Sequence, residues 1–166
     1  MKINELLAKE LPKKGYCGQC DDFVSYHVES FKDQVHNVKG LEVISDEFIG
    51  ICDKCGNHIW IDEVESANDI IVYNEYKKKM GLLTTYEIKA IRKKRGMSQR
   101  ELAKFLCIGE KDIARYESGA IQTRAIDLMI RMVDDDETFA SMSKVVNNLK
   151  VAYSGVWYLA FYLVIL

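Results

Sequence analysis

The sequence contains Cys17-Gly18-Gln19-Cys20 and, after a gap of 31 residues, Cys52-Asp53-Lys54-Cys55. Two residues between the thiols of a tight turn let both sulfur atoms point at one ion, and two such turns supply the four ligands of a tetrahedral zinc site. We therefore predict that a structural Zn2+ is bound by Cys17, Cys20, Cys52 and Cys55. Four thiolates leave no open position for water, so we expect this site to be catalytically inert.

The residues around the two motifs favour a small β-sheet. Residues 23–31, 41–44 and 58–61 are rich in β-branched and aromatic side chains, and Gly40 offers a turn between the first two stretches. Such a sheet buries little apolar surface, so metal binding would supply much of its stability. A redox-active dithiol is the alternative, but it needs one C-x-x-C motif beside a βαβ pattern, which the sequence lacks.

The first residues bear on the compartment. Residues 1–14 carry neither the apolar stretch nor the small-residue cleavage site of a secretory signal. Their apolar residues fall near helical spacing, so we expect a short amphipathic segment. These features favour a cytoplasmic protein, and in the cytoplasm paired cysteines are more often metal ligands than disulfides.

Charge divides the chain into parts that suit different partners. The net charge is only −2, yet residues 1–76 hold 7 basic and 15 acidic side chains, whereas residues 77–131 hold 14 basic and 6 acidic ones. An acidic front joined to a basic middle is typical of two modules. The basic module is the one suited to the phosphate backbone of a nucleic acid.

The basic part has the pattern of several helices. Residues 62–79 have the apolar spacing of a helix, and a glycine then breaks it. Short helices follow from residue 84, and Ser98 with Glu101 forms a capping box at the start of the second one. Cys107-Ile108-Gly109 makes a turn before the third. Two short helices separated by a three-residue turn predict a helix-turn-helix.

A helix-turn-helix reads DNA mainly with the N-terminal half of its second helix. Lys111 and Arg115 would reach base edges or phosphates from that helix, and the other candidates would lie near the phosphate backbone. The candidate DNA-binding residues are Gln99, Arg100, Lys111, Arg115, Lys94 and Arg95. Cys107, a lone thiol in an apolar turn, is expected to be a small buried residue.

The helix-turn-helix resembles the Xre/Cro type in two motifs, Ser98-Gln99-x-x-Leu102-Ala103 and Ile113-Ala114-Arg115-Tyr116-Glu117-Ser118-Gly119. It departs from that type at Cys107, where a glycine is usual, and at Gly109, where a serine is usual. A four-cysteine zinc module, a connecting helix and an Xre domain together resemble the MqsA-like antitoxins of bacterial toxin–antitoxin operons, over residues 15–140.

That resemblance implies two binding functions. The zinc module would bind and neutralise a toxin, and the helix-turn-helix would dimerise on an operator and repress the operon. In the family, an asparagine and an arginine of the recognition helix contact DNA. The arginine corresponds to Arg115, and Lys111 stands at the asparagine position.

The C-terminal tail is a feature that the two domains do not require. Residues 151–166 contain no ionised side chain, and the run is shorter than the roughly 20 apolar residues of a membrane-spanning helix. Such a segment aggregates unless something covers it. Its own fold, a dimer partner or another protein could do so, and we favour a chaperone. The candidate chaperone-binding residues are Val156, Trp157, Tyr158, Leu159, Phe161, Tyr162 and Leu163.

This arrangement resembles toxin–antitoxin–chaperone systems, in which a SecB-like chaperone binds a hydrophobic segment at the C-terminus of the antitoxin. Some of these systems sense phage infection. The expected organisation is α+β with two small domains. It comprises an amphipathic segment (1–14), a zinc-bound β-sheet module (15–62), a connecting helix and linker (63–83), an all-α helix-turn-helix domain (84–140) and a hydrophobic tail (141–166).

The sequence thus favours a binding protein, expected to be a homodimer without a membrane anchor. Its leading function is that of an antitoxin and autoregulatory repressor. The alternative is a stand-alone phage or host transcriptional regulator with a zinc-stabilised N-terminal domain. An enzyme is not expected and no catalytic residue is predicted, because the sequence shows no nucleophile–base pair, open metal site or phosphate-binding loop.

Overall fold

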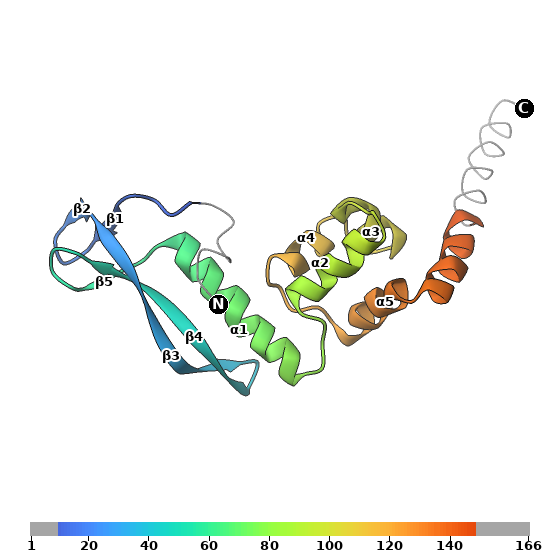
Figure 1. The fold of residues 1–166 in the computed structure, drawn as a ribbon, viewed down its shortest axis with the longest axis horizontal. Coiled ribbons are helices and arrows are strands. Elements are labelled where there is room, and N and C mark those ends of the chain that lie inside the picture. Colours follow the sequence, from blue (N-terminus) through green and yellow to red (C-terminus); the bar gives the residue numbers. More distant parts are fainter. Residues whose placement is uncertain (1–9, 149–166) are drawn as a thin grey trace, which may run out of the picture. The chain divides into compact units, whose positions relative to one another are not determined.

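The computed structural model describes residues 10–148 and divides the chain into two compact units. The sheet unit comprises Met1–Thr85 and Ser118–Ile121, and the helical unit comprises Tyr86–Glu117 and Gln122–Leu166. Figure 1 shows that strands fill the first part of the chain and helices the second. The first nine residues of the expected amphipathic segment (1–14) and the candidate chaperone-binding residues (156–163) lie outside the described residues.

Two antiparallel sheets make up the β part of the sheet unit. Strands β1 and β2 pair with each other, and the second sheet has the order β3-β4-β5. The strands are β1 (Gly15–Cys17), β2 (Asp22–Val24), β3 (Tyr26–Val38), β4 (Leu41–Cys52) and β5 (His58–Ile59). Lys39 and Gly40 form the turn of the β3–β4 hairpin with φ values of 51° and 82°, a region that suits glycine. The Asn37 side chain supports this turn by accepting a hydrogen bond from the Gly40 amide (3.0 Å).

The β3–β4 hairpin is longer than the sequence predicted. The composition indicated a strand only as far as residue 31, whereas β3 continues to Val38. The polar residues between Phe31 and Gln34 are accommodated by a shift in the β3–β4 register, a bulge at which Asp33 adopts a φ of 52°. Beyond the bulge, Val35 pairs with Ile44 and the ladder runs to the turn.

Helix α1 (Asp62–Lys79) packs against β4 and has the bounds that the sequence predicted. Acidic residues occupy its first turn and three lysines its last, as the helix dipole favours. The buried Asn68 side chain bonds both polar groups of the Phe48 backbone, because it accepts from the amide (2.9 Å) and donates to the carbonyl (2.7 Å). Asn68 thus replaces a neighbouring strand at this point of β4.

Two small apolar clusters lie in the sheet unit. One joins the cysteine motifs to the start of α1 and contains Cys17, Val24, Phe48, Cys52, Ile59, Ile61 and Val64. The other, near the hairpin turn, contains Val38, Val43, Val72 and Tyr76. Because neither cluster is large, the cysteine end of the unit needs a further source of stability.

The helical unit contains the predicted bundle. Its helices are α2 (Thr85–Lys94), α3 (Gln99–Phe105), α4 (Asp112–Glu117), α5 (Arg124–Asp134) and a last helix over residues 136–148, here called the C-terminal helix. Fully buried side chains from these helices form the core, namely Ile88, Leu102, Ala103, Ile113, Ile130 and Val133. The structure therefore confirms an α+β fold in which a small sheet precedes a bundle of helices.

Of two local predictions for the helical unit, one is confirmed and one was wrong. The capping box is present, with Ser98 Oγ accepting from the Glu101 amide and the Glu101 carboxylate accepting from the Ser98 amide. The prediction that Cys107 is buried was wrong, because this residue is exposed and adopts a φ of 54° in the turn after α3. No helix within residues 10–148 is both long enough and apolar enough to cross a membrane.

Candidate metal centre and helix-turn-helix surface

The four predicted metal ligands come together at one end of the sheet unit. The Sγ atoms of Cys17, Cys20, Cys52 and Cys55 all lie within 4.8 Å of one another. The Cys17 and Cys55 sulfurs are 3.5 Å apart, and those of Cys20 and Cys52 are 4.0 Å apart. Cys17 ends β1 and Cys52 ends β4, so the two strands deliver the two motifs to the same point.

Backbone geometry shapes each motif into a tight turn. After Cys52, the amides of Lys54 and Cys55 point toward the Cys52 sulfur at 3.3 and 3.4 Å. The turn closes when the Gly56 amide donates to the Cys52 carbonyl oxygen (2.9 Å), with Gly56 at a φ of 75°. Amides directed at a sulfur atom stabilise a thiolate, which is the form that binds a metal ion.

The acidities of the cysteines differ within the cluster. Burial opposes ionisation of Cys52, but the amides of Cys55 and Lys54 outweigh it and lower the pKa of this thiol to about 7. For Cys20, the hydrogen bond with Cys55 and then burial raise the pKa to about 12. Four crowded thiols therefore cannot all ionise together unless a positive ion compensates them. The donor set fits a thiophilic divalent ion in tetrahedral coordination.

The histidines of the sheet unit are not part of this cluster of four sulfurs. His27 lies nearby, but its ring nitrogens contact Asp53 Oδ1 (2.6 Å) and Glu29 Oε1 (3.1 Å). These hydrogen bonds, first that of Asp53, raise the pKa of His27 above its ordinary value. His27 thus ties β3 to the second cysteine motif from outside the centre.

In the helix-turn-helix, Gln99 has a structural partner. Its side-chain amide donates to Glu117 Oε2 (2.8 Å), and the same carboxylate is held by Arg92 through Nε–Oε1 (2.5 Å) and Nη2–Oε2 (2.9 Å). Arg92 also donates to the Met97 carbonyl (2.8 Å). Burial opposes ionisation of Glu117, but Arg92 and then Gln99 outweigh it and hold the pKa of this carboxyl below its usual value. Sequence reasoning missed this group, because Arg92 and Glu117 are two of many charged residues in this part of the chain.

The exposed basic residues of α3 and α4 lie beside acidic ones. Arg100 faces Glu110 (3.2 Å), which also pairs with Lys104 (3.5 Å), and Arg115 faces Asp112 (3.4 Å). All of these basic side chains are more than half exposed, so the pairs are weak and can be exchanged for contacts with phosphates. Lys111 is exposed at the start of α4.

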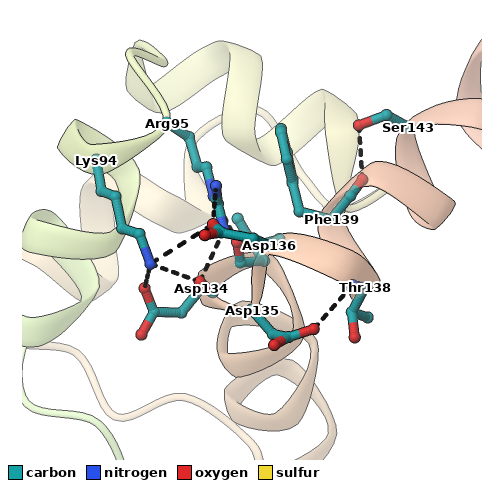
Figure 2. A network of polar contacts seen from close by, with 9 residues as sticks. Lys94, Arg95, Asp134, Asp135, Asp136, Thr138, Phe139 and Ser143 are labelled. Carbon is teal, nitrogen blue, oxygen red and sulfur yellow. Dashed lines mark hydrogen bonds and ion pairs between the residues drawn. The ribbon is translucent and has the colours of Figure 1, made fainter.

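Lys94 and Arg95 occupy a different place from these residues. As Figure 2 shows, both reach toward the short acidic stretch between α5 and the C-terminal helix. Lys94 Nζ contacts Asp134 Oδ1 (2.8 Å), and Arg95 Nη1 contacts Asp136 Oδ1 (2.7 Å). The complementary charges of residues 92–95 and 134–137 were a signal in the sequence that could have indicated this contact.

Comparison with known families places most of the chain in one family. Residues 13–139 match the family described as the antitoxin component of a bacterial toxin–antitoxin system, MqsA. A comparison with curated proteins found no match. The family match covers more than half of the 166 residues and includes all four cysteines as well as helices α1 to α5. The chain therefore belongs to the MqsA antitoxin family.

Proposed function

We propose that this protein is an antitoxin that neutralises a cognate toxin and represses its own operon. The observation that carries the proposal is the family match over residues 13–139, which spans both the four-sulfur centre and the helix-turn-helix. The two units differ in charge as the two partners require. The acidic sheet unit suits a basic toxin, and the basic helical unit suits DNA.

In this proposal the ion at the four cysteines is Zn2+ and its role is structural. Zn2+ prefers four thiolates in tetrahedral arrangement and offers no open position once they are bound. The ion would join the ends of β1 and β4, where the apolar cluster is small. Zinc therefore contributes to toxin binding indirectly, by keeping the sheet folded.

The DNA-binding surface is proposed to lie on α3 and α4. Arg115 extends from α4, the helix that enters the major groove in this motif, Lys111 immediately precedes that helix, and Arg100 lies at the start of α3. Gln99 and Arg92 would act through Glu117, by fixing α4 against its neighbours. Two copies of the chain would bind the two halves of a symmetric operator as a homodimer.

The C-terminal residues are proposed to bind a third partner. Residues 151–166 lack ionised side chains, and a SecB-like chaperone that binds extended apolar segments would protect them in the cytoplasm. Release of the chaperone, for example during phage infection, would then expose the antitoxin to aggregation and free the toxin.

Co-purification tests the proposal most directly. The tagged full-length chain is expressed together with the genes that adjoin its own, and proteins that remain bound through a high-salt wash are identified. Capture of a small protein whose expression alone arrests growth, and whose effect this chain reverses, is the expected result. A chain that binds DNA but captures no neighbouring gene product would favour the alternative, a stand-alone transcriptional regulator. Either result is compatible with a non-enzymatic protein.

A further inference from the structure

The junction between α5 and the C-terminal helix is a break that no helix-breaking residue causes. Helix α5 ends at Asp134, Asp135 is extended with φ −75° and ψ 128°, and residues 136–148 are helical again. The stretch from Arg124 to Asn148 contains neither glycine nor proline. Sharp breaks in helices usually have such a residue or an inserted side chain as their cause. Here the cause must lie in side-chain contacts.

Arg95 supplies one set of these contacts, to backbone carbonyl oxygens at the end of α5. Its Nε donates to the Val133 carbonyl oxygen and its Nη2 to the Asp134 carbonyl oxygen, both at 2.7 Å. In an uninterrupted helix these two carbonyls would accept from the amides of residues 137 and 138. Arg95 thus takes both backbone acceptors that would otherwise join the helices. Lys94 Nζ shares one of them, the Asp134 carbonyl oxygen (2.7 Å), whereas the Val133 carbonyl is held by Arg95.

Asp135 supplies the matching contact on the donor side. Its carboxylate accepts from the Thr138 amide (2.8 Å), as an N-cap residue does at the start of a new helix. The donor and the acceptor of one bond of a continuous helix, Thr138 N–H and Asp134 C=O, are therefore each satisfied by a side chain. The alternative with one long helix would need no side chain at this point.

Phe139 connects the junction to the helix-turn-helix. Its ring lies 4.4 Å from the Arg95 guanidinium carbon and 5.2 Å from the Phe105 ring at the end of α3. Figure 2 shows Arg95 extending between the acidic stretch and Phe139. The Arg95 side chain is only 11 % exposed, so it is enclosed by these contacts. A change of the junction would withdraw Phe139 from Phe105.

We propose that Arg95 is the latch of a two-state junction. When Arg95 holds the Val133 and Asp134 carbonyls, residues 124–148 form two helices and Phe139 packs on α3. When Arg95 leaves, the helices join into one and Phe139 leaves α3. A partner bound to residues 151–166, as in the proposed function, would act on the helix-turn-helix if it favoured one of these two states, and DNA would act on the junction by the same linkage.

The test uses nuclear magnetic resonance of the full-length protein in four forms. These are the wild type, Arg95→Met, Arg95→Met with Asp136→Pro, and Asp135→Ala. The first readout is the Cα and Cβ chemical shifts of residue 135, which distinguish extended from helical backbone. In the Asp135→Ala variant, the Cα shifts of residue 135 and its neighbours are used. The second readout is contacts between the Phe105 and Phe139 rings. Proline at position 136 suits the first turn of a helix but not its interior, so it enforces the break without Arg95.

The proposal expects an extended residue 135 and ring contacts in the wild type, with the joined helix below about 10 % of the population. Arg95→Met should make residue 135 helical and abolish the ring contacts, and the added Asp136→Pro should restore the extended residue and the ring contacts.

If Arg95→Met folds with wild-type shifts and ring contacts, the proposal is wrong. If Arg95→Met does not fold, Asp135→Ala decides. This variant loses the cap on Thr138 while Arg95 still holds the two carbonyls, so the Cα shifts around residue 135 should move part of the way toward helical values. Cα shifts of the neighbouring residues identical to those of the wild type would overturn the proposal. Neither test depends on toxin, operator or chaperone, so failure of the proposed function would leave the result unaffected.

Discussion

Arg92 and Glu117 form a two-point ion pair inside the helix-turn-helix, with Nε–Oε1 at 2.5 Å and Nη2–Oε2 at 2.9 Å. Their side chains are only 13 % and 4 % exposed. The pair joins α2 to the end of α4, the helix proposed to enter the DNA groove. The position of α4 is therefore set by a charge contact that water reaches poorly, and not by apolar packing alone.

Removing the charge of Glu117 should destabilise the helical unit. Glu117→Gln leaves Arg92 without a counter-charge, and we expect a loss of about 3 kcal/mol in the free energy of unfolding, measured by urea titration of the helical circular dichroism signal. Glu110→Gln, which breaks only exposed pairs, is the matched control and should cost less than about 1 kcal/mol. Equal stability of the two variants would contradict this account.

The same pair gives the sign of a pH dependence. The pKa of Glu117 is lowered in the folded protein, so the unfolded chain binds the proton more tightly. The stabilisation is fully present above the unfolded value of about 4.3 and declines as the pH falls through the folded value. Urea titrations between pH 7 and pH 3 should show a steeper loss of stability for the wild type than for Glu117→Gln. Parallel curves would mean that Glu117 does not contribute.

Loss of the metal ion should unfold one unit and spare the other. Chelation or Cys52→Ser is expected to unfold residues 15–62, while the helical unit keeps its circular dichroism and amide signals, because the apolar cluster at the cysteines is too small to persist alone. Cys107→Ser is the control, since this thiol is exposed and lies in the turn after α3. Unchanged near-ultraviolet spectra after complete removal of zinc would contradict a structural role.

Arg115→Ala should weaken operator binding by about 1–3 kcal/mol if the side chain contacts a base. A fluorescence anisotropy titration at several salt concentrations measures the effect and separates base contacts from phosphate contacts. Asp112→Asn should tighten binding slightly, because it removes the acidic neighbour of Arg115. Lys13→Ala, an exposed basic residue of the sheet unit, is the control and should leave affinity unchanged. Wild-type affinity of Arg115→Ala at every salt concentration would exclude Arg115 from the interface.

Deletion of residues 151–166 should make the protein independent of a chaperone. The full-length chain, expressed alone, is expected to aggregate or be degraded faster than the shortened chain, because the deleted residues carry no ionised side chain. The measurements are the soluble fraction and the lifetime after synthesis is stopped. Equal solubility and lifetime of both forms in cells without a SecB-like chaperone would refute the proposed role of the segment.

Features with a local cause were predictable from the sequence. The spacing of the four cysteines indicated one metal centre, the apolar period indicated α1, and Ser98 with Glu101 indicated the start of α3. Each signal depends on residues within a few positions of one another, or on a metal whose ligand number is fixed. The family resemblance came from the same local motifs, and the family match agrees with it.

Features that depend on distant partners were not predictable in this way. In the sequence, Asn68 is an ordinary polar residue of a helix. In the structure its side chain bonds the amide and the carbonyl of Phe48, which lies twenty positions earlier. For Arg95 we predicted a phosphate contact; the acidic residues 134–137 hinted at an ion pair, but the sequence does not show that the carbonyls of Val133 and Asp134 lie within reach of its guanidinium. Cys107 was misjudged because an apolar neighbourhood in sequence does not fix the direction of a side chain at positive φ.

The cysteine centre also changes how the β3–β4 hairpin is connected. One motif precedes the hairpin, and the other begins at its last residue, Cys52. An ion bound to all four sulfur atoms would therefore close residues 20–52 into a loop. In such a loop, the turn at Lys39 and Gly40 can open without separating β3 from β4. The loss of chain entropy on closing the loop is imposed at the cysteines and not at this turn. A protease cut at this turn would therefore yield two pieces that stay attached through the metal and separate only when a chelator removes it.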